Sequence, residues 1–441
     1  MKRLTIVGGG WAGLAAAVRA TELGWQVSLL EAAPTLGGRA RRIEHQGLVL
    51  DNGPHLLIGA YTHTLALMRK LGLDTERMFW RMPLNLRNPQ GMGLSLPDLR
   101  PPWNLLWGIT ASNALDWRDK LSLIGMAAGW QRAGFVCPPL MSVRELCMGL
   151  RPRVISHLIE PLCVSALNTP IDQACATVFL RVLRDALYGA PGGADFLLPR
   201  SDMSALLPDA ALAWLRARGA QIQLGQHQKF CPQAPDADDA VLLACPAWEA
   251  ARLTQAVNPT WSAQAAQMKH EGIATVYLRC TSTSTSTSTS TSTSTSTSTS
   301  TSTSNGNGLG PAVLPRPMVA LDSGPNAPAQ FVFDRGALSG DRAQRGILAA
   351  VVSACQGERA HITQAVLGQI QKQLGLDGLQ VITTVVERRA TFSCTPGLTR
   401  PPARIGPGLW ACGDHVQGPY PATLEGAVRS GLEVVDQLTQ G

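Results

Sequence analysis

The sequence predicts an α/β fold with more than one domain, and three observations support this prediction. Residues 4–7 and 26–30 are short apolar runs typical of buried parallel strands, with an alanine-rich helix predicted between them over 14–23. Apolar residues at helical spacing predict helices over 116–130 and 142–190. The length of 441 residues exceeds what one simple core accommodates, so two lobes are expected.

A glycine turn follows the first predicted strand, where Gly8, Gly10 and Gly13 have the spacing G-x-G-x-x-G. Glycines here allow a tight turn, close approach of a pyrophosphate to the backbone, and close packing of helix on strand. The N-terminus of the helix offers free N–H groups to the anion. Glu31 ends the second strand about twenty residues further on, where an acid can accept hydrogen bonds from ribose hydroxyls. The order strand, turn, helix, strand and acid predicts a dinucleotide-binding domain of Rossmann type.

The loop after Glu31 predicts a further contact with the dinucleotide. Gly37 and Gly38 let the backbone come close to a ligand. The guanidinium of Arg39 can donate several hydrogen bonds to a phosphate.

The C-terminal part of the chain predicts a second contact region. Gly413 and Asp414 follow a short strand and precede Ala422, Thr423 and a predicted helix. Asp414 can accept a hydrogen bond from a ribityl hydroxyl, and the amides at the start of the helix, up to Gly426, can face a pyrophosphate or a flavin ring.

The remaining elements are predicted from apolar runs and from glycine and proline breaks. They are a hairpin over 43–50, a helix over 62–71, a strand over 196–198, a helix over 203–218, strands over 241–245, 273–278, 318–321, 331–334 and 347–353, and helices over 358–374 and 424–438. We expect a dinucleotide-binding domain from 1–79, 196–260 and 386–441, a helical cap and substrate domain from 80–195, and a substrate-domain sheet from 261–385. Twelve Thr-Ser repeats over 281–304 predict a disordered polar insert in that sheet.

Composition excludes several function classes. The formal charge is +7, but the basic residues are scattered, so no nucleic-acid partner is expected. The ten cysteines form no C-x-x-C pair and lack histidines at metal-binding spacing, which predicts reduced thiols, no metal site and a cytoplasmic protein. No run approaches the roughly 20 apolar residues of a membrane span. A signal peptide is not expected, because cleavage near Ala17 would remove the glycine turn.

Tryptophans gather at the start of the predicted helical cap. Trp103 and Trp107 are four residues apart, and Trp117 and Trp130 flank the next predicted helix. One interpretation is a helical cap with tryptophan in its core. The other is an interfacial surface in which Trp and Leu enter a bilayer beside Arg and Lys, which would suit a lipid substrate and place the protein peripherally on the inner face of the cytoplasmic membrane.

The motifs together resemble the flavin amine oxidase and phytoene desaturase superfamily of FAD proteins. Four stretches within the chain are similar to a narrower family, the squalene-associated FAD-dependent desaturases, or hydroxysqualene dehydroxylases, of bacterial hopanoid synthesis. These stretches are residues 51–61, 160–162, 166–170 and 420–427. The resemblance covers nearly the whole chain except the Thr-Ser tract. It implies a Rossmann-like FAD-binding domain of a glutathione-reductase-like two-domain flavoprotein, with a mixed α+β substrate domain and a helical cap.

The resemblance also implies a reaction. The substrate would be the C30 isoprenoid alcohol hydroxysqualene, the product squalene, and the cofactor FAD, with net replacement of C–OH by C–H. The leaving hydroxyl needs an acid, for which His55, in a polar loop after the hairpin, is the candidate; it could equally well only satisfy backbone groups. A reductase or NAD(P)H would supply electrons, and transient contact with prenyl-condensing enzymes of the squalene pathway is expected.

Two other functions remain open at the level of sequence. A carotenoid or phytoene desaturase, or an amine oxidase, would use the same FAD motifs, although the four tyrosines of the chain disfavour the aromatic cage of an amine oxidase. A non-enzymatic prenyl-lipid binding protein on this fold would lack flavin.

Overall fold

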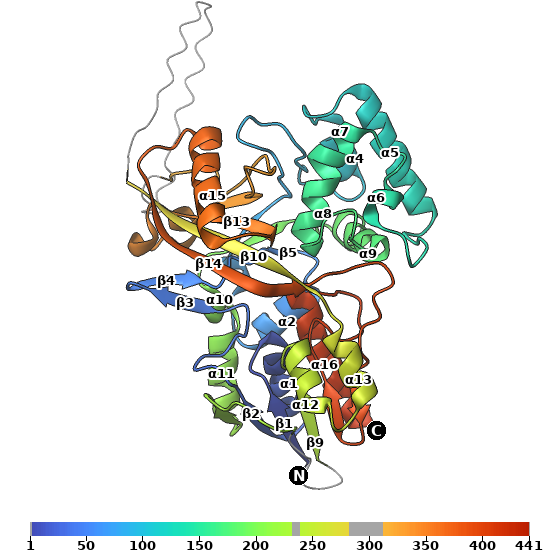
Figure 1. Ribbon diagram of the computed structural model, residues 1–441, viewed down its shortest axis with the longest axis vertical. Helices are drawn as coiled ribbons and strands as arrows, with labels where there is room; N and C mark the ends of the chain where they lie inside the picture. Colours follow the sequence, from blue (N-terminus) through green and yellow to red (C-terminus); the bar gives the residue numbers. More distant parts are fainter. Residues whose placement is uncertain (1, 232–238, 282–311, 441) are drawn as a thin grey trace, which may run out of the picture.

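Two lobes make up the computed structural model, which describes residues 2–231, 239–281 and 312–440 (Figure 1). The lower lobe is built on a six-stranded sheet. Its strands are, in spatial order, β15 (Arg404–Gly406), β16 (Leu409–Ala411), β9 (Ala240–Leu243), β1 (Arg3–Val7), β2 (Gln26–Leu30) and β8 (Gln221–Gln223). Neighbours pair in parallel except β15 and β16. The predicted Thr-Ser tract lies outside the described residues from 282 onward.

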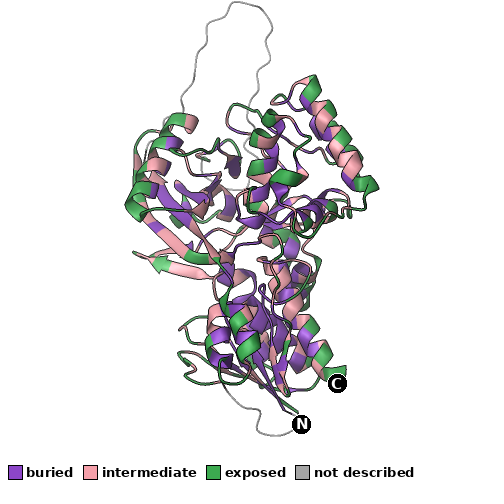
Figure 2. Cartoon of the chain, turned by 45° about the vertical axis from the view of Figure 1, so that its right-hand side comes forward, coloured by how far each residue is buried: buried purple, intermediate pink, exposed green. Residues whose placement is uncertain are grey.

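Helices cover this sheet, and Figure 2 shows the strands buried between them. They are α1 (Trp11–Glu22), α10 (Met203–Leu206), α11 (Pro208–Arg216), α12 (Ala247–Thr254), α13 (Pro259–Ala266) and α16 (Leu424–Gln440). The helix predicted from residue 14 begins earlier, at Trp11, so Gly13 lies inside its first turn. The helix predicted over 203–218 is wrong as one element: it breaks at Leu207, whose φ of −146° is not helical, and Pro208 starts a second helix.

The upper lobe contains an antiparallel five-stranded sheet. Its strands are, in spatial order, β11 (Met318–Ala320), β12 (Phe331–Asp334), β13 (Ile347–Cys355), β10 (His270–Cys280) and β14 (Leu379–Phe392). Helix α15 (Arg359–Leu374) packs on it through Ile362, Val366 and Ile370. Helix α14 (Arg335–Ser339) and a short 3₁₀ turn (Arg342–Gln344) follow β12.

The sequence did not predict β14 or β8. Strand β14 is an edge strand whose residues 381–386 form a β-branched run, but the strand continues past this run through the charged residues Glu387, Arg388 and Arg389. The expected domain boundary at 385/386 falls inside this strand, which pairs with β10 along His270–Cys280. The strand therefore carries the chain from the upper sheet back to the lower lobe.

Smaller elements join the lobes. They are the hairpin β3 (Arg42–His45) and β4 (Leu48–Asp51), the three-stranded sheet of β5 (Leu57–Ile58), β7 (Phe196–Pro199) and β6 (Phe79–Met82), and helices α2 (Thr62–Lys70) and α3 (Thr75–Met78). The predicted hairpin and the predicted helix over 62–71 are thereby confirmed.

A helical region completes the upper lobe. It contains α4 (Trp103–Thr110), α5 (Trp117–Arg132), α6 (Val143–Leu146), α7 (Pro152–Val154), a π-helical turn (Ile155–Ile159), α8 (Glu160–Leu167) and α9 (Ala176–Leu187). Asn168, in a left-handed conformation at the end of α8, ties this region to the upper sheet. Its side chain donates to Thr391 (2.9 Å) and accepts from the amide of Ala354 (2.6 Å). Among the described residues, no helix has the length and apolar character needed to cross a membrane.

Candidate functional site

The glycine turn lies at the carboxyl end of β1, where parallel sheets bind ligands. A Cβ at Gly13 would lie 2.0 Å from the carbonyl oxygen of Gly8, so this glycine is required for packing of α1 on the strand. Gly10 differs. Its φ of −72° suits any residue, and the nearest atom to a Cβ there would be the Cα of Gly38, 3.9 Å away. The packing of the chain therefore does not demand glycine at position 10, whereas close approach of a ligand does.

Glu31 is held beside this turn by two backbone amides. Its Oε2 accepts from the amide of Gly9 (2.6 Å), and its Oε1 accepts from the amide of Ala33 (2.7 Å). Each carboxylate oxygen retains a lone pair for a further donor. The side chain is therefore positioned at the end of β2, as an acceptor for ribose hydroxyls requires.

The loop with Gly37 and Gly38 lies against the glycine turn. The amide of Gly37 donates to the carbonyl of Gly9 (2.9 Å), and Gly10 and Gly37 pair as an isolated parallel bridge. Both predicted glycine loops thus meet at one place.

Arg39 joins the N-terminal and C-terminal motifs. It donates through Nη2 to Oδ1 of Asp414 (2.7 Å) and through Nη1 to the carbonyl of Ala390 on β14 (2.6 Å). Burial would raise the pKa of Asp414, but the charges of Arg39 and His415 and the hydrogen bond from Arg39 hold this pKa below its usual range. Arg39 and Asp414, 375 positions apart in sequence, are direct partners.

The start of α16 is fixed by its own side chains. Thr423 donates from Oγ1 to the carbonyl of Tyr420 (3.0 Å) and accepts from the amide of Gly426 (2.9 Å), while Ala422 has a φ of 56°. The expectation that the Gly426 amide faces a ligand is wrong, because Thr423 caps it.

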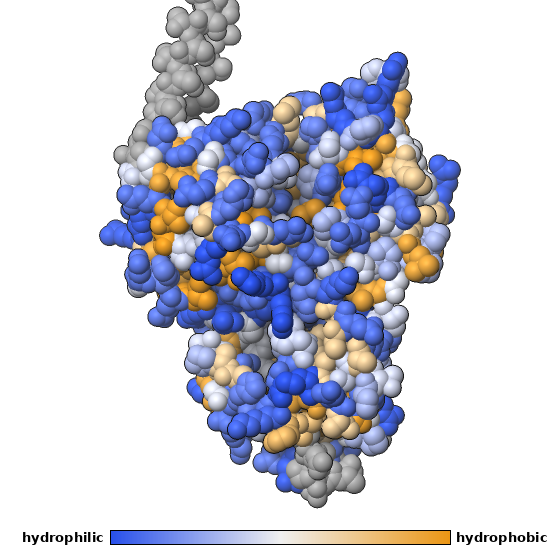
Figure 3. Space-filling model, in the orientation of Figure 1, coloured by the Kyte–Doolittle hydropathy of each residue, from blue (hydrophilic) through white to orange (hydrophobic). Residues whose placement is uncertain are grey.

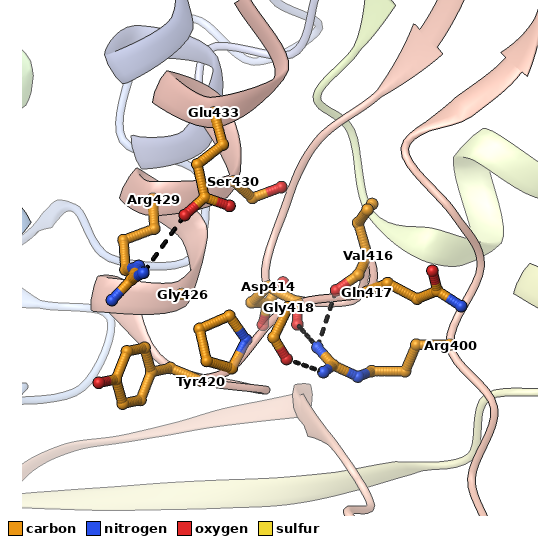
Figure 4. Close-up of a pocket in the computed structure, with 11 residues that line it drawn as sticks. Arg400, Asp414, Val416, Gln417, Gly418, Tyr420, Gly426, Arg429, Ser430 and Glu433 are labelled. Carbon is orange, nitrogen blue, oxygen red and sulfur yellow. Dashed lines mark hydrogen bonds and ion pairs between the residues drawn. The ribbon is translucent and has the colours of Figure 1, made fainter. Parts of the chain in front are cut away.

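A small pocket lies between α16 and the loop after Asp414 (Figure 4). Arg400 fixes this loop by donating to the carbonyls of Val416 (2.7 Å) and Gly418. The residues that line the pocket are Arg400, Asp414, Val416, Gln417, Gly418, Pro419, Tyr420, Gly426, Arg429, Ser430 and Glu433.

Glu425 is a structural residue. The carboxylate is 1% exposed and accepts from the amide and ring of His63 and from the amide and hydroxyl of Thr64, at 2.7 to 3.1 Å. These bonds cap α2 and attach it to α16.

His55 is half-buried, and its Nδ1 lies 2.9 Å from the carbonyl oxygen of Gly53. Burial lowers the pKa of His55, and the hydrogen bond to Gly53 opposes this effect. The neutral ring therefore donates from Nδ1 and leaves Nε2 as an acceptor.

A network around Asp51, which the sequence did not predict, holds the loop that carries His55. The Asp51 carboxylate accepts from Arg335 Nη1 (2.7 Å) and from the amide of Met203 (2.8 Å), and its carbonyl accepts from the Tyr277 hydroxyl (2.9 Å). The signal that could have identified it is an acid at the very end of an apolar strand, next to a polar loop.

His415, which follows Asp414, is a second residue that the sequence did not assign. It is 3% exposed, and its Nε2 has no hydrogen-bond partner among the described residues. Burial lowers its pKa to about 4, the Asp414 charge opposes this effect, and the charges of Arg39 and Arg400 add to it. An orphaned buried nitrogen next to the Arg39–Asp414 pair is consistent with a bound group that supplies its partner.

We expect His415→Asn to reduce the acid sensitivity of the protein without a bound ligand. The pKa of His415 falls from 6.5 to about 4 on folding, so the unfolded state binds more protons between these values, and stability falls as pH decreases through this range. The wild type should therefore lose about 2 to 3 kcal/mol more than the variant between pH 7 and pH 4. Urea unfolding at both pH values measures the difference; equal losses in the two proteins would contradict a buried neutral ring.

Comparison with known proteins agrees with this geometry. Residues 6–71 match the family described as NAD(P)-binding Rossmann-like domain. The crystal structure of an oxidoreductase from Methanosarcina mazei superposes with a TM-score of 0.67 at 14% identity, covering 98% of this chain and 100% of that one. The predicted α/β fold, with a Rossmann-like domain and a mixed second domain, is confirmed.

Similarity in sequence extends over the full length. A hydroxysqualene dehydroxylase from Rhodopseudomonas palustris is 26% identical over 99% of this chain and 98% of its own length. One from Zymomonas mobilis is 24% identical over 98% of this chain and 97% of its own length. The resemblance predicted from the sequence is confirmed: this chain is similar to the hydroxysqualene dehydroxylases from end to end.

Proposed function

We propose that this protein is an FAD-dependent oxidoreductase of isoprenoid biosynthesis that reductively removes the hydroxyl group of hydroxysqualene to give squalene. The observation that carries the proposal is the end-to-end similarity to proteins named hydroxysqualene dehydroxylase, which includes the upper lobe as well as the nucleotide-binding part.

The described residues fit FAD. Glu31 would accept from the ribose, the turn at Gly10 and the N-terminus of α1 would face the pyrophosphate, and Asp414 would accept from the ribityl chain. The free space over Gly10 and the orphaned Nε2 of His415 support this assignment. Reduced FAD would supply the hydride that replaces the hydroxyl group.

The chain's own contribution would be a proton. Replacing C–OH by C–H takes one hydride and one proton and releases water, and the two electrons come from a reductase partner or from NAD(P)H. His55 would donate the proton from Nε2 to the leaving oxygen, while its Nδ1 stays bound to Gly53. Transient contact with prenyl-condensing enzymes would deliver the apolar substrate.

We expect His55→Ala to abolish dehydroxylation while FAD remains bound. Because the pKa of His55 lies below its usual range, the protonated fraction is small at neutral pH, and turnover of the wild type should rise as pH falls below 6.5. Product formation by the reduced protein across this pH range measures both effects. Normal turnover in the variant would remove His55 from the mechanism.

The alternatives differ in what they do to the substrate. A desaturase or an amine oxidase would oxidise its substrate and reduce FAD, whereas dehydroxylation consumes reduced FAD. A prenyl-lipid binding protein would be purified without flavin, so a yellow protein with flavin absorption bands excludes it.

A further inference from the structure

Helix α4 presents an apolar face to the solvent. Trp103, Leu106 and Trp107 are exposed, by 66%, 39% and 61%, while Asn104, Leu105, Gly108 and Ile109 face the interior. The helix contains no charged residue. A surface helix normally directs polar side chains outward, so this orientation indicates a covering partner.

The start of α5 extends this face. Trp117 and Leu121 are 63% and 60% exposed and lie four positions apart, on one side of the helix. Lys120, on the same side, donates to the carbonyl of Thr110 at the end of α4 (2.7 Å). We call Trp103, Leu106, Trp107, Trp117 and Leu121 the tryptophan face. Trp130, in contrast, is buried. The interpretation of a cap with tryptophan in its core therefore holds for Trp130, whereas Trp103, Trp107 and Trp117 are exposed.

The location of the tryptophan face is compatible with docking. Helices α4 and α5 form the outer part of the upper lobe, away from the six-stranded sheet (Figure 1). In Figure 3, hydrophobic residues interrupt the polar surface at several places on the upper lobe. Of the 14 exposed large hydrophobic residues among the described ones, 10 lie between Met92 and Met148.

The charges around this face favour an anionic partner. Arg100 precedes α4, and the exposed Arg118 lies 5.1 Å from the ring of Trp117. The nearby carboxylates of Asp116 and Asp119 are engaged with Arg151 at 3.7 and 2.9 Å and in the capping box of α5. The described residues around this face thus combine exposed tryptophan with arginine, and Asp98 is the one nearby acid that is not paired with Arg151. Tryptophan beside arginine is the combination that binds the interface of an anionic bilayer.

We propose that the tryptophan face docks on the surface of a bilayer that contains anionic phospholipids, with the indole rings in the headgroup region and Arg100 and Arg118 on the phosphates. This contact goes beyond the proposed reaction and does not depend on it. It would place the upper lobe against the phase in which an apolar C30 molecule dissolves.

The test is co-sedimentation of the full-length holoprotein with vesicles of phosphatidylcholine and phosphatidylglycerol in equal parts, and with vesicles of phosphatidylcholine alone. The wild type should bind the mixed vesicles more tightly, with a blue shift of tryptophan emission. The double variant Trp103→Ser/Trp107→Ser should bind the mixed vesicles roughly tenfold or more weakly. Phe230→Ser is the matched control, because Phe230 is 83% exposed and lies outside the tryptophan face.

Because the replaced side chains are exposed, the variants should unfold at the wild-type temperature, which circular dichroism checks. Equal vesicle binding by wild type and double variant would overturn the proposal, as would absence of binding by the wild type. Self-association of the wild type without lipid, lost in the double variant, would assign this face to a second copy of the chain and also overturn it. Activity on detergent-dispersed hydroxysqualene, unchanged in the double variant, tests the proposed reaction separately.

Discussion

Gly10→Ala is expected to fold like the wild type and to lose its flavin. The new Cβ meets only the Cα of Gly38 at 3.9 Å, an ordinary contact, and the φ of −72° is normal for alanine. A pyrophosphate that lies against this turn would collide with the added methyl group, so the affinity for FAD should fall at least about tenfold. Flavin absorbance per protein after purification and titration of the apoprotein with FAD measure the loss.

Gly13→Ala is the matched comparison. Its Cβ would lie 2.0 Å from the carbonyl oxygen of Gly8, so the strand and helix must move apart, at a cost of about 1 to 3 kcal/mol in the stability of the apoprotein. The two variants thus separate binding from folding. A Gly10→Ala protein with wild-type FAD affinity would show that the pyrophosphate lies elsewhere.

Arg39→Ala should have the second large effect, on both stability and flavin binding. The substitution removes the guanidinium 2.7 Å from the Asp414 carboxylate, which is 8% exposed, and leaves a buried charge without its partner. The expected loss in the free energy of unfolding is about 3 kcal/mol at neutral pH. It also removes the contact to Ala390, which ties the loop to β14.

The double variant Arg39→Ala/Asp414→Asn provides the control. It also removes the buried negative charge of Asp414, so it should recover part of the stability lost in Arg39→Ala. The pKa of Asp414 is lowered in the folded state, so the stabilisation is present above the unfolded pKa and disappears as pH falls through the folded pKa. The difference between wild type and Arg39→Ala should therefore shrink in acid. A difference that is independent of pH would mean that Asp414 is not the group affected.

Local sequence predicted the nucleotide-binding part well because each of its features has a local physical cause. The strand ending at Val7, the glycine spacing, Glu31 and the Gly413-Asp414 turn can each be recognised within a few residues. The direct pairing of Arg39 with Asp414 was not predicted, because it depends on how the loop after β2 folds back toward the loop after β16.

The parts that could not be predicted depend on tertiary packing. The second half of strand β14, over 387–392, is defined by its pairing with β10, since Glu387, Arg388 and Arg389 favour an exposed segment. The capping of Gly426 by Thr423 and the burial of His415 depend on how α16 meets the loop before it. Exposure of Trp103 and Trp107 follows from which side of α4 the upper lobe covers, and helical spacing alone leaves that side undetermined.

The direction of the reaction is tested most directly by one measurement. The purified holoprotein, reduced chemically under anaerobic conditions, is mixed with hydroxysqualene, and the hydrocarbon is identified while the flavin absorbance is followed. We predict squalene in an amount equal to the flavin that becomes reoxidised. Unchanged hydroxysqualene beside flavin that stays reduced would contradict the proposed function, and so would a more unsaturated product formed only by the oxidised protein.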